Sequence, residues 1–185
     1  DSLERFRSVV ETARGHGVRV RGYVSCVVGC PYEGPIAPAK VAEVCLQLQE
    51  MGCQEISLGD TIGVGTPASV TAMLEACLRH LPAAQLAGHF HDTYGMAVAN
   101  VAASLAMGLR TFDSSVSGLG GCPYAAGASG NVATEDLVYL LHGQGLRTGI
   151  DLDRLVAISG WISMLLQRSP ASKVTRALLA CSLPN

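Results

Sequence analysis

The stretch Gln85-Leu-Ala-Gly-His-Phe-His91 decides the fold. It has the pattern of a short strand that ends in a turn signal, and its last residues include two histidines two positions apart. A helical pattern follows, because Val98, Val101, Ala102 and Leu105 repeat with the 3.6-residue period of an amphipathic helix. A strand followed by a helix is the unit from which parallel α/β sheets are built.

The same unit recurs along the chain. Three further strands are predicted, at 18–26, 54–60 and 110–116. Apolar periodicity predicts helices at 2–16, 41–51, 70–81, 98–105, 134–141 and 152–166. Helix boundaries carry their own chemistry: Thr66 before Pro67 suits a helix start, and Gly52 and Gly108 suit helix ends.

This order of elements is α(βα)₄ followed by a helical tail. It predicts a parallel sheet with right-handed crossovers, belonging either to a doubly wound fold or to part of a (β/α)₈ barrel. Periodicity favours neither arrangement over the other. No linker or low-complexity tract divides the chain, so we expect one structural unit.

Composition excludes several classes of protein. The chain has 185 residues, of which 49% are hydrophobic, so intrinsic disorder is excluded. A formal net charge of −2 without a basic run argues against a nucleic-acid partner, and no apolar stretch has the length of a membrane span. The cysteines are seven and scattered, which favours a reducing compartment over a disulfide framework.

Polar and reactive residues follow all four predicted strands. Because the carboxyl ends of parallel strands meet at one rim, where α/β proteins build their sites, we expect these side chains to converge. They are Cys26 and Cys30, then Asp60 and Thr61, then His89, His91 and Asp92, and finally Ser114, Ser115 and Cys122.

His89 and His91 form the most informative pair. Residues two apart on a strand point to the same side, so both imidazoles can reach one cation, whereas Asp92 points away. With the amide oxygen of Asn131 the ligands would be N, N and O, which favours Mg²⁺ or Mn²⁺. Zinc stays open if a cysteine of the rim joins, and a pair of hydrogen-bonded histidines that supports a loop is the non-metal alternative.

A glycine-dense loop at 117–131 follows the fourth strand and contains Cys122. Its five glycines suit a mobile lid that brings one thiol to a ligand. It lacks the G-K-[ST] ending of a phosphate-binding P-loop. The alternative is a flexible surface loop with an incidental cysteine.

Several blocks of the sequence resemble the 3-hydroxy-3-methylglutaryl-CoA lyase family, in the family's order and over nearly the whole chain. The most specific block is Ser115-Val-Ser-Gly-Leu-Gly-Gly-Cys-Pro-Tyr124, which resembles the active-site signature of that family. The others are Arg21-Gly-Tyr-Val-Ser-Cys26, Gly29-Cys-Pro-Tyr-Glu-Gly34, Glu55-Ile-Ser-Leu-Gly-Asp-Thr-Ile-Gly-Val-Gly65, His89-Phe-His-Asp-Thr-Tyr-Gly95 and Gly130-Asn-Val-Ala-Thr-Glu-Asp-Leu-Val-Tyr139.

The resemblance implies a metal-dependent carbon-carbon lyase that cleaves 3-hydroxy-3-methylglutaryl-CoA into acetoacetate and acetyl-CoA, in leucine degradation and ketogenesis. It implies that His89, His91 and Asn131 hold the divalent cation, Mg²⁺ or Mn²⁺, and that Cys122 is the catalytic cysteine of the lid. Asp60 matches an acidic residue near the substrate and, with His89, is a candidate for the base. Within the matching blocks, Tyr23 and Thr61 are expected to bind substrate.

The resemblance also implies a TIM barrel, of which this chain matches strands five to eight and the C-terminal helices. We therefore expect a partial-barrel lyase domain over 1–185, with βα units at 1–133, the lid at 117–131 and C-terminal helices at 134–185. The family places a metal-binding aspartate and a charge-stabilising arginine on its first strand, which this sequence does not match. The chain alone is expected to be incomplete as a catalyst.

Two other functions stay open. One is a related acyl-CoA-condensing synthase of the same barrel family, such as homocitrate or isopropylmalate synthase, against which the lid cysteine argues. The other is a non-catalytic half barrel that acts as an interaction partner. The expected partners are the CoA substrate and either a second copy in a homo-oligomer, a dimer, or a complementing N-terminal half. The expected location is the cytoplasm in a bacterium and the mitochondrial matrix in a eukaryote.

Overall fold

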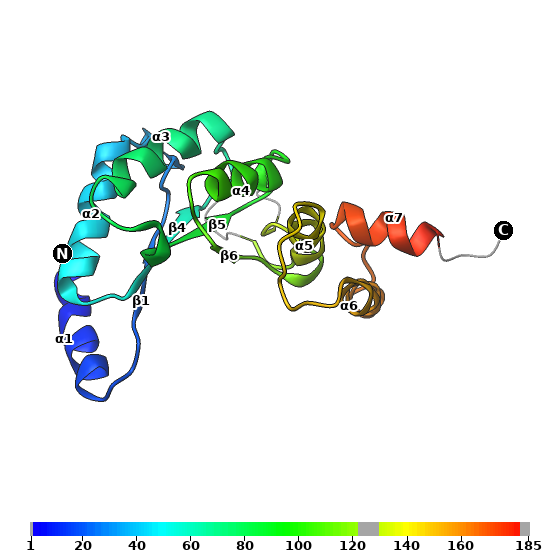
Figure 1. The fold of residues 1–185 in the computed structure, drawn as a ribbon, viewed down its shortest axis with the longest axis horizontal. Helices are drawn as coiled ribbons and strands as arrows, with labels where there is room; N and C mark the ends of the chain where they lie inside the picture. Colours follow the sequence, from blue (N-terminus) through cyan, green and yellow to red (C-terminus); the bar gives the residue numbers. More distant parts are fainter. Residues whose placement is uncertain (1, 122–129, 182–185) are drawn as a thin grey trace.

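The computed structural model, which describes residues 2–121 and 130–181, is an α/β fold with a four-stranded parallel sheet (Figure 1). This confirms the predicted class, and each strand lies inside its predicted stretch. The strands follow the order β1-β4-β5-β6, so each new strand is added to the same edge of the sheet. They are β1 (Arg21–Val24), β4 (Glu55–Asp60), β5 (Leu86–Phe90) and β6 (Thr111–Asp113).

Helices cover one face of this sheet. Figure 1 shows α2, α3 and α4 following one another along the sheet, and the last two helices beyond its β6 side. The six predicted helices are present as α1 (Ser2–Gly15), α2 (Pro38–Met51), α3 (Pro67–Leu78), α4 (Ala97–Ala106), α5 (Thr134–Gly143) and α6 (Leu152–Leu165).

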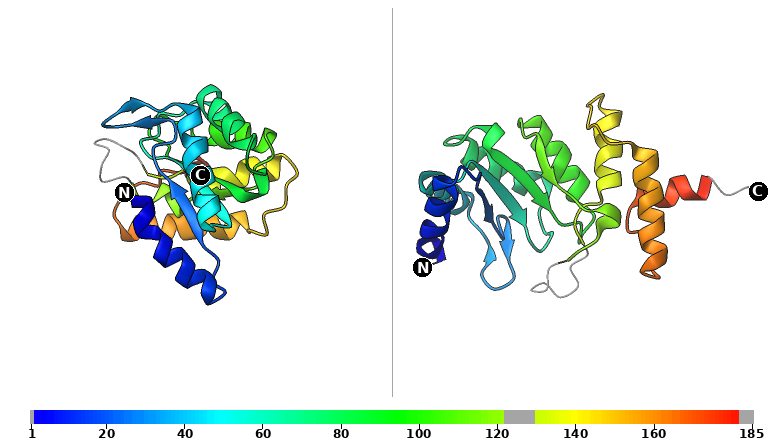
Figure 2. Two further views of the ribbon diagram at one scale, coloured as in Figure 1. Left: turned by 90° about the vertical axis from the view of Figure 1, so that its left-hand side faces the viewer. Right: turned by 90° about the horizontal axis from the view of Figure 1, so that it is seen from below.

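Five short elements were not predicted from the sequence. They are the antiparallel hairpin of β2 (Gly29–Cys30) and β3 (Gly34–Pro35), the 3₁₀ turns η1 (Ala83–Gln85) and η2 (Val116–Gly118), and the helix α7 (Lys173–Cys181). Figure 2 shows α7 at the end of the molecule farthest from α1. The strands and 3₁₀ turns among them have two or three residues, which is too short for periodicity to be detected.

The predicted helix boundaries are confirmed. The Thr66 hydroxyl accepts the backbone N–H of Ser69, and the Ser69 hydroxyl accepts that of Thr66, so the two residues form a capping box before Pro67. Gly52 ends α2 with φ 114°, a left-handed conformation that favours glycine, and its N–H bonds to the carbonyls of Leu48 and Gln49.

The two faces of the sheet differ in chemistry. Ile56, Leu58 and Phe90 point toward the helices and are at most 1% exposed, so they form the core. The alternating positions on the other face carry polar side chains, and those of Arg21, His89 and Asp113 are 25%, 29% and 21% exposed. Because successive residues of a strand point to opposite faces, the sheet separates an apolar core from a polar face.

In the described part of the chain, no helix is long and apolar enough to cross a membrane.

The capping box gives a stability prediction. Thr66→Ala removes the acceptor for the Ser69 N–H, so we expect the free energy of unfolding to fall by about 1 kcal/mol in a urea titration. Thr71→Ala, inside the same helix, is the matched control and should change it by less than about 0.5 kcal/mol. Equal losses in the two variants would show that the cap contributes nothing specific.

Candidate active site at the carboxyl ends of the strands

His89 and His91 lie together on the polar face, as predicted. Their ring centroids are 5.4 Å apart, and His91 continues β5 through a bridge to Asn131. His91 is 6% exposed; burial, and then the proximity of His89, lower its pKa below the ordinary value. A lowered pKa keeps this imidazole neutral near pH 7, which is the form that binds metal ions.

The carboxylate of Asp113 contacts the ring of His89. Asp113 Oδ2 lies 3.0 Å from His89 Nδ1 and accepts the hydroxyl of Ser57 at 2.9 Å, while Oδ1 accepts Arg21 Nη1 at 2.7 Å. Burial would raise the pKa of Asp113, but the hydrogen bonds from His89, Arg21 and Ser57 outweigh it and hold the pKa at about 2. The carboxylate is therefore ionised near neutral pH.

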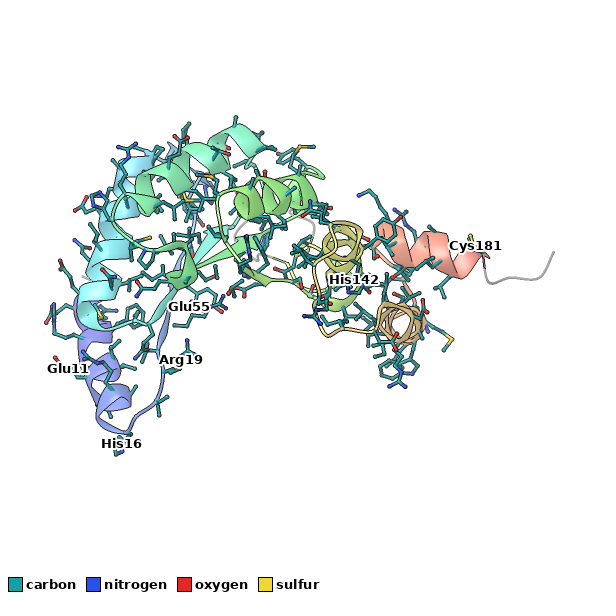
Figure 3. All side chains as sticks on the ribbon, in the orientation of Figure 1. Glu11, His16, Arg19, Glu55, His142 and Cys181 are labelled. Carbon is teal, nitrogen blue, oxygen red and sulfur yellow. The ribbon has the colours of Figure 1, made fainter. Side chains whose placement is uncertain are left out.

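Arg21 is held on several sides. Its Nε contacts Glu55, the first residue of β4, its Nη1 reaches Asp113, and its guanidinium lies 5.1 Å from the ring centre of Tyr23. Figure 3 labels Glu55 and Arg19, which mark the amino-terminal ends of β4 and β1. Ion pairs and hydrogen bonds therefore connect the residues of the polar face from the amino-terminal end of β4 to the histidines.

Three atoms of this cluster suit a divalent cation. His91 Nδ1 is buried and has no hydrogen-bond partner among the described residues. His89 uses Nδ1 for Asp113, which leaves Nε2, and Asn131 Nδ2 donates to the Leu119 carbonyl, while the Asn131 side chain also lies within hydrogen-bonding reach of His91. Across the described residues, no group of three or more His, Cys, Asp and Glu is gathered. Among the described residues, Cys26 and Cys30 therefore do not complete a zinc set with the two histidines.

Asp60 occupies a different position from the histidines. In the strand register Asp60 pairs with Phe90, whereas Gly59 pairs with His89, so its side chain starts on the helix-covered face. It is 0% exposed, and its two oxygens accept the backbone N–H groups of Val64 and Gly65 at 3.2 and 2.8 Å. Burial raises the pKa of Asp60, and these hydrogen bonds oppose the rise. The carboxylate holds the turn 61–66.

The two predicted substrate-binding residues are placed differently. Tyr23 is 58% exposed on the polar face, and its ring meets the ring of His89 edge-on at 6.3 Å between centroids. Thr61 Oγ1 accepts the backbone N–H of Cys26 at 2.8 Å, so it links the carboxyl ends of β1 and β4. The Tyr23 ring is therefore accessible to a ligand, whereas the Thr61 hydroxyl accepts a hydrogen bond from the backbone.

Other residues of the predicted rim have structural partners. Asp92 points away from the histidines, as predicted, and its Oδ1 accepts the N–H of Ala97 at the start of α4. Ser114 Oγ bonds Thr134 Oγ1 at 2.9 Å, and Ser115 Oγ donates to the Leu119 carbonyl. Cys122, with the rest of 122–129 of the predicted lid, lies outside the described residues.

The sequence analysis missed Arg21, Ser57 and Asp113 as members of the site. The sequence candidates were taken from the carboxyl end of each predicted strand, and Arg21 and Ser57 lie nearer the amino-terminal ends. The signal was available, because the alternating positions Arg21 and Tyr23, Glu55 and Ser57, and Thr111 and Asp113 are polar in strands whose other positions, apart from Asp60, are apolar or glycine.

The comparisons with known proteins agree with this geometry. A family model described as HMGL-like matches residues 1–162. The chain belongs to the HMGL-like family. The predicted resemblance is thereby confirmed, and the parallel α/β sheet is that of this TIM-barrel family.

Three similar proteins carry lyase names. The chain is 60% identical over 178 residues to the mitochondrial hydroxymethylglutaryl-CoA lyase of Arabidopsis thaliana, with 96% of this chain and 38% of that protein covered. It is 58% identical over 182 residues to hydroxymethylglutaryl-CoA lyase of Pseudomonas mevalonii, with 98% and 60% covered. The crystal structure of hydroxymethylglutaryl-CoA lyase from Pseudomonas aeruginosa superimposes with a TM-score of 0.94 at 56% identity, over 98% of this chain and 61% of that one. The chain thus spans 38% to 61% of the length of these relatives.

The depressed pKa of Asp113 predicts a dependence of stability on pH. Its pKa is about 2 in the folded chain and 3.8 ordinarily. The difference stabilises the fold by about 2 kcal/mol above pH 4, and this contribution is lost as the pH falls through about 2. We expect acid unfolding of the metal-free chain in EDTA to show this loss and Asp113→Asn to lack it. Superimposable pH profiles after normalisation would contradict the prediction.

The turn held by Asp60 gives a second prediction. Asp60→Asn replaces one acceptor oxygen by an NH₂ group facing a backbone N–H, so we expect the free energy of unfolding to fall by about 2 kcal/mol in urea. Asp153→Asn, at an exposed position of α6, makes the same charge change and should be nearly neutral. A fully stable Asp60→Asn chain would mean that the turn does not depend on this carboxylate.

Proposed function

We propose that this chain carries part of the active site of a hydroxymethylglutaryl-CoA lyase, which cleaves 3-hydroxy-3-methylglutaryl-CoA into acetoacetate and acetyl-CoA. The observation that carries the proposal is the cluster of His89, His91 and Asn131, with Asp113 behind it, in a chain 58–60% identical to proteins with that name. The buried Nδ1 of His91, which has no hydrogen-bond partner among the described residues, favours a ligand role over a pair of loop-supporting histidines.

We propose that His89, His91 and Asn131 hold a divalent cation, Mg²⁺ or Mn²⁺. Two imidazole nitrogens and an amide oxygen fit such an ion, and the oxygen favours these two metals over softer ones. When bound, the cation supplies Lewis acidity toward the C3 hydroxyl and a template that orients the carbon-carbon bond.

The side chains of the polar face would orient the substrate. Tyr23 lies beside His89 with its ring exposed, and Arg21 donates a hydrogen bond to its hydroxyl at 2.7 Å, which fixes the ring. In the reaction the C3 hydroxyl loses its proton, the bond from C3 to the thioester methylene breaks, and the methylene carbon accepts a proton. We propose Cys122 as the donor of that last proton, as the family resemblance implies.

For Asp60 we propose a role through the turn 61–66 that it holds. The sequence made it a candidate for the base, together with His89. Its oxygens accept two backbone N–H groups on the helix-covered side of the sheet, which favours support of Thr61 and its neighbours over proton transfer.

The remainder of the barrel would come from another polypeptide segment. We propose that β1, β4, β5 and β6 correspond to strands five to eight of a TIM barrel, and that activity requires the preceding four strands. Two edge strands, β1 and β6, suit pairing with that half. A homo-oligomer remains our proposal for assembly. The relatives include mitochondrial and bacterial proteins, which supports a location that depends on the source.

The experiment is an acetoacetate-release assay with 3-hydroxy-3-methylglutaryl-CoA and Mn²⁺ or Mg²⁺, using the chain alone and with the preceding half of a related lyase supplied in trans. We expect activity only in the mixture, and its loss in EDTA. His91→Ala should lower it by more than about 100-fold, since losing a ligand costs more than losing an outer-shell partner. Cys122→Ser should keep Mn²⁺ binding and lose most turnover.

Asp153→Asn is the control for general effects of substitution. Release of acetoacetate that EDTA and His91→Ala both leave unchanged would overturn the metal-dependent lyase proposal. Activity toward condensation of acyl-CoA with a 2-oxo acid, in place of cleavage, would favour the synthase alternative.

A further inference from the structure

Asp113 connects the candidate metal ligands to the rest of the sheet. It is the last residue of β6, it pairs in register with His89, and its side chain lies on the same polar face. Its carboxylate is 21% exposed and receives hydrogen bonds from the three other strands of the sheet. The function proposed above uses His89 but gives no account of this carboxylate.

The two oxygens of Asp113 are used differently. Oδ1 accepts a hydrogen bond from Arg21 Nη1 at 2.7 Å. The arginine therefore does not compete with other donors for Oδ2. Oδ2 accepts Ser57 Oγ at 2.9 Å and lies 3.0 Å from His89 Nδ1. Because the carboxylate can only accept, the proton of this contact belongs to the histidine.

A proton on Nδ1 of His89 decides what the other ring nitrogen can do. In a neutral imidazole one nitrogen is a donor and the other an acceptor, so a proton on Nδ1 leaves a lone pair on Nε2. The carboxylate also fixes the rotation of the ring. Metal-binding histidines in general have such a partner, which sets the tautomer and raises the basicity of the ligand.

A purely structural role for Asp113 would be satisfied by Arg21 alone. Arg21 already contacts Glu55, so the ion pair with Asp113 is not needed to neutralise the arginine. The hydroxyl of Ser57, which is 0% exposed, donates to the same oxygen that faces His89 and holds it in place. This arrangement orients Oδ2 toward the histidine.

We propose that Asp113 is a positioning residue for His89: Oδ2 accepts the Nδ1–H and thereby presents Nε2 to the divalent cation, and Ser57 and Arg21 hold the carboxylate in that orientation. The inference rests on the proposed function in requiring a cation at His89. It adds the residues that set the affinity of the site.

Two measurements on the chain test this. The first is long-range ¹⁵N–¹H NMR of histidine-labelled, metal-free protein, with His89 assigned from the His89→Gln variant among the five histidines. We expect the Nδ1–H tautomer in the unaltered chain and its loss in Asp113→Asn. The second is Mn²⁺ titration by calorimetry, in which Asp113→Asn should weaken binding by about 10–100-fold and Ser57→Ala by less.

Two further variants separate positioning from general damage. Asp113→Glu keeps the acceptor and should recover part of the affinity and the Nδ1–H tautomer. Asp153→Asn makes the same charge change at an exposed position and should alter neither measurement. If Asp113→Asn does not fold, the tautomer of His89 in the unaltered chain and the Mn²⁺ titration of Ser57→Ala still test the positioning role.

The outcomes distinguish this inference from the proposed function. Nε2–H as the tautomer of His89 in the unaltered chain, or Mn²⁺ affinity unchanged in a folded Asp113→Asn chain, would overturn the inference alone. Failure of the unaltered chain to bind Mn²⁺, both alone and mixed with the preceding half of a related lyase, would overturn it together with the proposed metal site. The Nδ1–H tautomer with weakened Mn²⁺ binding in Asp113→Asn supports it.

Discussion

Hydrogen bonds to the carboxylate of Asp113 connect all four strands of the sheet. It belongs to β6 and accepts hydrogen bonds from Arg21 of β1, Ser57 of β4 and His89 of β5. A buried charge on a sheet face costs free energy unless it is paired and hydrogen-bonded. Asp113 and its three donors therefore stabilise one another. The polar face therefore exists as one network, and the histidines stand at its carboxyl end.

The opposite face of the same strands forms the apolar core. Leu58 and Phe90 pack under the helices, and Asp60 holds the turn that leads from β4 to α3. Glycine is needed where strands and turns approach closely: a Cβ at Gly65 would lie 2.7 Å from Asp60 Oδ2, and one at Gly88 would lie 2.7 Å from the ring of Phe90. A rigid support of this kind keeps the ligands of a site in place before any ligand arrives.

Much of this could be predicted from the sequence. The four strands and six helices followed from apolar periods of two and 3.6, because burial of one face imposes these periods. The proximity of His89 and His91 followed from their spacing on a strand. The hairpin at Gly29–Pro35 could not be predicted, since a few residues do not define a period, and the helix Lys173–Cys181 was not predicted either. The division of roles between Asp60 and Asp113 could not be predicted either, although both end a strand.

The sequence by itself determined the α/β class, the family and the residue types available at the rim, because these depend on local pattern and on matching blocks. The tertiary structure decided which of two strand-end carboxylates contacts the ring of His89. Gly59, and not Asp60, lies in register with His89, and Asp113 lies in register on its other side. Register is set by how whole strands pair, and a shift of one residue exchanges the two faces, so it cannot be derived from any strand alone.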